Sequence, residues 1–101
     1  MNDNLEKNTI LLAQLTYMLH EAGMHQLGKV KSPITNKLER NLPAAQGTID
    51  MLDMLHTKMK GNLSAEEDKM MANIIRELKL NYIDEMGKPD LPPEQEEKKP
   101  E

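Results

Sequence analysis

The stretch from Lys58 to Glu67 restricts the fold more than any other part of this chain. Gly61 suits the left-handed conformation that closes many helices, because glycine has no Cβ to clash. Ser64 then suits an N-cap, and Glu67 three residues later completes a capping box. A helix end followed so closely by a helix start predicts a tight helical hairpin. Four residues are expected to shape the turn: Gly61, Asn62, Ser64 and Glu67.

Apolar residues recur at helical spacing on both sides of this turn and again near the N-terminus. They predict helices over about residues 4–27, 41–60 and 65–86. The predicted fold is therefore all-α, with three helices in a single domain over residues 1–86. The second and third helices would form the hairpin, and the domain is expected to assemble into a homo-oligomer.

Two segments lie outside the predicted helices. A basic loop over residues 28–40 joins the first two helices. The tail over residues 87–101 is acidic and rich in Pro, and it has too little apolar surface to offset the entropy cost of ordering. We expect this tail to be disordered.

Composition narrows the class of protein. The chain has 101 residues with nine Met, two Tyr and no Phe or Trp, so Met, Leu and Ile are expected to fill the core. The absence of Cys excludes disulfides and thiol catalysis. A net charge of −4 argues against a general nucleic-acid binder. No apolar run approaches the roughly 20 residues that span a membrane, and no secretory signal is recognisable, so a cytoplasmic protein is expected.

The first predicted helix carries more apolar surface than one contact needs. At about 100° per residue, its apolar positions form two stripes. The first stripe, with its flanks, contains Leu5, Leu11, Leu12, Leu15, Met18, Leu19 and Ala22. The second contains Ile10, Ala13, Tyr17 and Met24. The sequence leaves two interpretations of the second stripe open: packing against a helix of the same chain, or a contact between subunits.

Further apolar residues lie outside the main faces of the second and third helices. We therefore expect a protein-interaction or assembly module without catalytic activity, which forms a homo-oligomer, a dimer first of all, and which can have another protein as partner. The candidate interface residues are Ile10, Ala13, Tyr17, Met24, Met54, Leu80 and Ile83.

Three His residues are the natural candidates for chemistry. His20 and His25 are five residues apart and lack the four-residue spacing of a helical metal pair. No metal site, cofactor or catalytic residue is therefore expected, and His56 is expected to be a hydrogen-bonded core or interface residue. The alternative is an enzyme, or an enzyme accessory subunit, with a site at a subunit interface near His20 or His56. A dry, packed His56 favours the interaction module, whereas an open pocket with carboxylates favours the enzyme.

The basic loop also has two interpretations. Lys29, Lys31, Lys37 and Arg40 are opposed there only by Glu39. These cations are expected to be solvated loop charges, and the alternative is a site for an anionic ligand.

A set of residues around the turn matches a recognisable pattern: Leu27, Gly28, Ile49, Asp50, Leu52, Leu55, Lys58, Gly61, Asn62, Leu63, Ser64, Glu67, Leu78 and Tyr82. With this set the chain resembles the short bacterial helical proteins of domain-of-unknown-function family 1844, roughly from residue 10 to residue 84. Met59 departs from the pattern, in which a Thr is expected. The resemblance implies a helical fold, and it implies no activity, ligand or functional residue.

Overall fold

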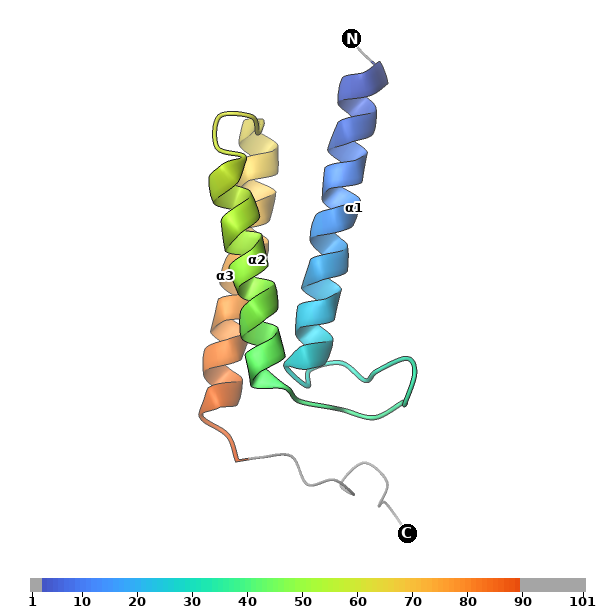
Figure 1. Cartoon of the computed structure of the whole chain (residues 1–101), viewed down its shortest axis with the longest axis vertical. Helices are drawn as coiled ribbons and strands as arrows, with labels where there is room; N and C mark the ends of the chain where they lie inside the picture. The colour runs from blue at the N-terminus through green and yellow to red at the C-terminus, as the bar shows by residue number, and fades with distance from the viewer. Residues whose placement is uncertain (1–2, 90–101) are drawn as a thin grey trace.

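The computed structural model describes residues 3–89, and their side chains from residue 5 onward. It contains α1 (Asp3–Gln26), α2 (Leu42–Lys58) and α3 (Ala65–Met86), with no strand in the described part (Figure 1). The all-α prediction with three helices is confirmed. The tail expected to be disordered lies outside the described residues from position 90 onward.

The turn between α2 and α3 has the predicted local features. Gly61 has a φ of +92°. The Ser64 hydroxyl accepts from the Glu67 N–H at 3.1 Å, and the Glu67 carboxylate accepts from the Ser64 N–H at 2.9 Å. These two bonds form the capping box and start α3 at Ala65. The second helix, however, ends two residues earlier than predicted, because Met59 is its C-cap and accepts from the Asn62 N–H at 2.8 Å.

Helices α2 and α3 run side by side in opposite directions (Figure 1). Asp53 and Lys79 form an ion pair between them with an O–N distance of 3.1 Å. Helix α1 lies against this pair near its C-terminal end and diverges from α2 toward its N-terminus (Figure 1), where Thr9 still hydrogen-bonds with Glu67 of α3. At the close end, the Asn41 N–H donates to the Gln26 carbonyl at 2.7 Å, so the ends of the long connecting loop meet.

The core lies between the three helices and consists mainly of aliphatic residues: Leu27, Ala45, Ile49, Leu52, Met71, Ile74, Ile75 and Leu78. Met71 is the one fully buried Met among the described residues. The expectation that Met residues fill the interior holds only in part: Met24 and Met70 also pack against the core, but Met18, Met51, Met54 and Met86 are exposed. The core instead depends on Leu and Ile, whose rotamers are better defined.

Gly23 allows α1 to approach the other helices closely. A Cβ at this position would lie 2.9 Å from the Leu78 Cδ2 atom and 3.5 Å from the Thr48 Cγ2 atom. Because Leu78 is fully buried, it has little freedom to move away.

Within the described residues, no helix has the length and apolar character needed to cross a membrane.

Candidate interaction surface

The side of α1 that packs inside the chain is narrow and contains small and polar residues. Thr16 and Gly23 are buried, Leu12 and Leu19 are half-buried, and Leu27, the residue after the helix, is buried as well. Thr16 can be buried because its hydroxyl donates to the Leu12 carbonyl at 2.8 Å. The sequence predicted two apolar stripes on this helix; the structure buries a line that takes Leu12 and Leu19 from the edge of the first stripe and adds Thr16 and Gly23, which belong to neither stripe.

The opposite side of α1 is apolar and exposed. We call this side the outer face of α1, and it consists of Ile10, Leu11, Gln14, Tyr17 and Met18. These residues lie within one third of the helix circumference, at positions expected to face a partner helix. Ile10 is 58% exposed, Tyr17 54% and Met18 66%. Contiguous apolar surface of this kind on a folded chain usually marks an interaction site.

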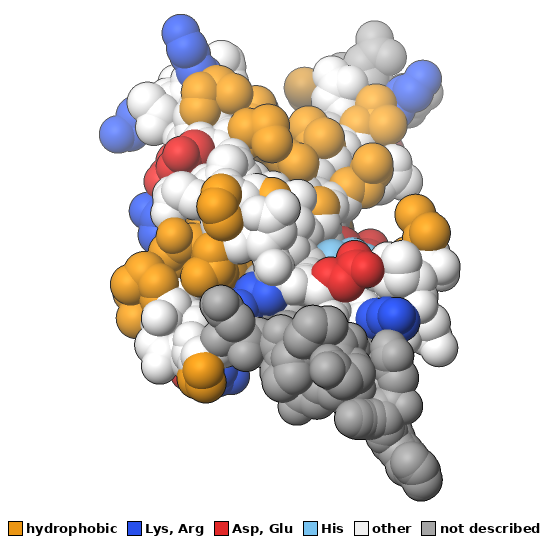
Figure 2. All heavy atoms as spheres, turned by 60° about the horizontal axis from the view of Figure 1, so that its bottom comes forward, with side chains coloured by type: hydrophobic (Ala, Val, Ile, Leu, Met, Phe, Trp, Pro, Cys, Tyr) orange, Lys and Arg blue, Asp and Glu red, His pale blue; other side chains and the backbone are white. Residues whose placement is uncertain are grey.

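The outer face has a shallow hollow at its centre. The hollow has a volume of about 540 Å³ and is lined by Ile10, Ala13, Gln14, Tyr17, Met18 and Glu21. Its lining is mostly apolar, with one amide and one carboxylate at the edge. Figure 2 shows that hydrophobic side chains are also exposed elsewhere, both on the N-terminal part of α1 and on α2 and α3 near the turn that joins them. The hollow is nevertheless confined to α1.

The structure brings together only part of the predicted interface. Ile10 and Tyr17 lie on the outer face, and Ala13 lies half-buried at its edge. Met24 is half-buried and packs against the core of its own chain, away from the outer face. Three exposed residues do not line the hollow on α1: Met54, Leu80 and Ile83. By their spacing in the sequence, Leu11 and Met18 group with the first stripe, because the spacing does not show which line of α1 is buried.

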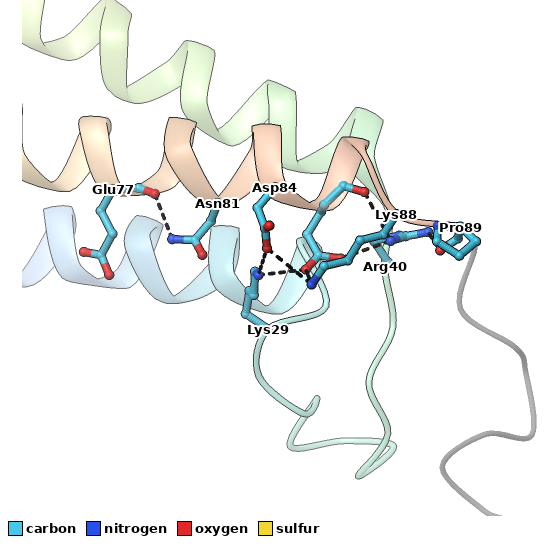
Figure 3. A network of polar contacts seen from close by, with 8 residues as sticks. Lys29, Arg40, Glu77, Asn81, Asp84, Lys88 and Pro89 are labelled. Carbon is cyan, nitrogen blue, oxygen red and sulfur yellow. Dashed lines mark hydrogen bonds and ion pairs between the residues drawn. The ribbon is translucent and has the colours of Figure 1, made fainter.

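A cluster of charged side chains, with Glu85 and Arg40 buried at its centre, lies where the loop meets the end of α3 (Figure 3). The buried Glu85 carboxylate accepts from Lys29 at 2.8 Å, Lys88 at 2.9 Å and Arg40 at 3.0 Å. Asp84 lies 2.7 Å from the Lys29 Nζ atom. The expectation of solvated loop charge was therefore wrong for Lys29 and Arg40, whose charges are neutralised by α3.

The charge cluster favours the charged forms of Glu85 and Lys29. Burial raises the pKa of Glu85, but hydrogen bonds from Lys29, Lys88 and Arg40 outweigh burial and lower the pKa to about 2. The hydrogen bonds to Asp84 and Glu85 in turn raise the pKa of Lys29. Glu85 and Lys29 are thus held in their charged forms at neutral pH.

One signal in the sequence pointed to this cluster and was missed. Asp84 and Glu85 occupy the last turn of α3, where the helix dipole disfavours acidic residues. Acids in such a position usually have cationic partners, and the loop supplies them. Arg40 also donates to the Pro89 carbonyl at 2.6 Å, so ordered contacts extend past Gly87, where the tail was predicted to begin.

The surroundings of His56 are intermediate between a dry, packed site and an open pocket with carboxylates. Its Nε2 atom lies 2.7 Å from an Asp68 carboxylate oxygen, and the ring is half-buried. The ring borders an open hollow of about 280 Å³ lined by Asp53, His56, Ala72, Ile75, Arg76, Lys79 and Leu80. This lining includes a carboxylate but no hydroxyl or thiol group to act as a nucleophile.

The other His residues form weaker arrangements. The His20 Nε2 atom lies 3.2 Å from the Glu77 carboxylate without making a hydrogen bond, so the contact contributes only when His20 is protonated. His25 lines a separate hollow beside the loop. In the described part of the chain, no three His, Asp or Glu side chains are grouped closely enough to hold a metal ion.

Comparison with protein families finds a match that covers most of the described chain. The model of a family described as Domain of unknown function (DUF1844) matches residues 9–84, more than half of the sequence. This range contains all of α2 and the turn, and most of α1 and α3. No curated protein and no solved structure matches the chain significantly.

Proposed function

The chain belongs to the domain-of-unknown-function family 1844, whose description names no activity, and we propose that it is a protein-interaction module without catalytic activity. In this proposal the α2–α3 pair is a stable helical hairpin that holds α1 in place. Helix α1 then binds a second copy through its outer face, which gives a homodimer.

The observation that carries this proposal is the exposure of the outer face of α1. A helix in a small monomer usually exposes its polar side, because only one stripe needs to be apolar. Here the buried line contains Thr16 and Gly23, whereas Ile10, Tyr17 and Met18 remain in water. Burying those three side chains would gain free energy, at about 25 cal/mol per Å² of apolar area removed from water. A two-fold dimer does so with the same surface on both copies.

The charge at the edges of this surface is compatible with a protein partner. Lys7 and Glu21 lie beyond its two ends, and both are exposed. Interfaces commonly have such an apolar centre with a polar rim. Tyr17 adds a large area with a hydroxyl that can stay hydrated at the rim.

Light scattering on two matched variants tests this proposal. Tyr17→Glu would bury two unpaired charges per dimer and should raise the dissociation constant by about 100-fold or more. Ile34→Glu is the control, because Ile34 is 91% exposed in the loop and lies outside the outer face. We expect Tyr17→Glu to be monomeric at a concentration at which wild type and Ile34→Glu are dimeric. Equal masses for all three proteins would contradict the proposal.

A second candidate is a binding or catalytic site at His56. The His56–Asp68 pair beside an open hollow with Asp53 favours it, because a carboxylate-paired imidazole can move protons. The lining offers no hydroxyl or thiol group as a nucleophile, which weakens this candidate. A small-molecule screen by thermal shift tests it with His56→Ala as the comparison. A compound that stabilises only the wild type would favour a site at His56.

A further inference from the structure

We infer that the two copies pair along α1 in antiparallel orientation, with the two-fold axis at Gln14. This inference rests on the proposed self-association and adds its orientation and register. The partner is a second copy of the same chain, and its α1 would lie across the hollow on the outer face. The inference follows from how apolar and charged residues are distributed around Gln14.

The apolar residues of the outer face are arranged symmetrically about Gln14. Ile10 and Leu11 precede it by four and three residues, and Tyr17 and Met18 follow it by three and four. All four side chains are exposed and share one side of α1. An antiparallel pair centred on Gln14 therefore places Ile10 opposite Met18 of the second copy, and Leu11 opposite its Tyr17. Each large side chain then meets an apolar counterpart.

The charges around this segment distinguish antiparallel from parallel pairing. Lys7 precedes Gln14 by seven residues and Glu21 follows it by seven, so both lie on the outer side of α1. Neither has an ion-pair partner among the described residues. Antiparallel pairing brings each Lys7 to a Glu21 of the other copy. Parallel pairing in register would oppose like charges, which is unfavourable.

Gln14 and the hollow fit the centre of such a contact. A Gln amide can both donate and accept, so two Gln14 side chains on a two-fold axis can satisfy each other. The hollow of about 540 Å³ lies beside Gln14, where it can receive an apolar side chain from the second copy. Filling it would give the contact the close packing that specific interfaces have at their centre.

Disulfide cross-linking tests the orientation directly, because the chain has no Cys of its own. Lys7→Cys and Glu21→Cys are made separately, and one of them carries an affinity tag. In the inferred dimer, two copies of residue 7 lie about 21 Å apart along the helix axis, at 1.5 Å per residue. Under mild oxidation we therefore expect a linked heterodimer in the mixture and no linked homodimer of either variant alone. Asn73→Cys, exposed on α3, is the control for random linking.

The possible results of cross-linking and sedimentation distinguish the orientation of the dimer from self-association itself. Linked homodimers of Lys7→Cys would show parallel pairing and overturn the inference. A wild type that is dimeric by sedimentation, with no Lys7–Glu21 link in the mixture, would overturn the register but leave self-association standing. A monomeric wild type would overturn both. Charge reversal gives a second test: Lys7→Glu or Glu21→Lys should raise the dimer dissociation constant about tenfold, and the double variant should restore it.

Discussion

Glu85 is the side chain whose ionisation contributes most clearly to stability. Its pKa is about 2, against 4.5 for an ordinary Glu. A lowered pKa in the folded state gives stability that is present above pH 4.5 and is lost as the pH falls toward 2. At about 1.4 kcal/mol per pH unit, the contribution is at most about 3 kcal/mol.

Urea unfolding of wild type and Glu85→Gln checks this contribution. The variant should be about 3 kcal/mol less stable at pH 7, because Lys29 and Arg40 lose a buried counterion. The difference should shrink between pH 4.5 and pH 2, where Glu85 in the wild type takes up a proton. A difference that is independent of pH would show that Glu85 acts through packing and not through its charge.

The capping box is the second residue-scale feature with a measurable effect. Ser64→Ala removes the acceptor of the Glu67 N–H and should cost about 1 kcal/mol in the free energy of unfolding. Ser64→Asp keeps a good N-cap acceptor and should stay close to wild type. Thermal unfolding of the three proteins measures this. Equal midpoints for Ser64→Ala and wild type would argue against the cap.

Ser64 has its partners close by in the sequence and Glu85 does not, and this difference decides which side-chain contacts the sequence can predict. Ser64, Gly61 and Glu67 are close together in the chain, so their spacing alone indicated the turn. Arg40 and Glu85 are 45 residues apart, and no local pattern links them. Only the return of the loop to the end of α3 brings their charges together, and this depends on the packing of all three helices.

At the scale of elements, the helices follow from local patterns, but their contacts do not. The third helix has the predicted bounds, because the capping box and Gly87 define its ends locally. The line that α1 buries was not predicted, since Thr16 and Gly23 are not apolar enough to stand out between two stripes of larger residues. The buried line is the one at which Gly23 allows α1 to approach the other helices closely.

Two glycines inside helices provide a matched test of this close approach. Gly47→Ala should stabilise the protein by about 0.5–1 kcal/mol, because a Cβ there meets nothing within 4 Å and Gly is a poor helix former. Gly23→Ala gains the same propensity but must displace Leu78, so we expect no stabilisation or a net loss. Chemical denaturation of both variants measures the two effects. An equal gain at both sites would show that α1 does not pack as closely as described.

At the scale of the whole molecule, the structure leaves one helix with apolar residues on two sides. The excess apolar surface was evident in the sequence, and so was the expectation of self-association. The sequence did not show which side of α1 has this excess apolar surface, because Met24 packs inward whereas Leu11 and Met18 are exposed. The symmetry about Gln14 became visible only once the outer face had been located.

If a second copy covers the outer face of α1, the chain must self-associate in solution. Sedimentation equilibrium of the unmodified chain over a micromolar concentration series tests this most directly. We predict a mass that rises with concentration to twice the 11.5 kDa of one chain. A mass that stays at 11.5 kDa throughout would contradict the account, and Ile10, Tyr17 and Met18 would then be exposed on a stable monomer.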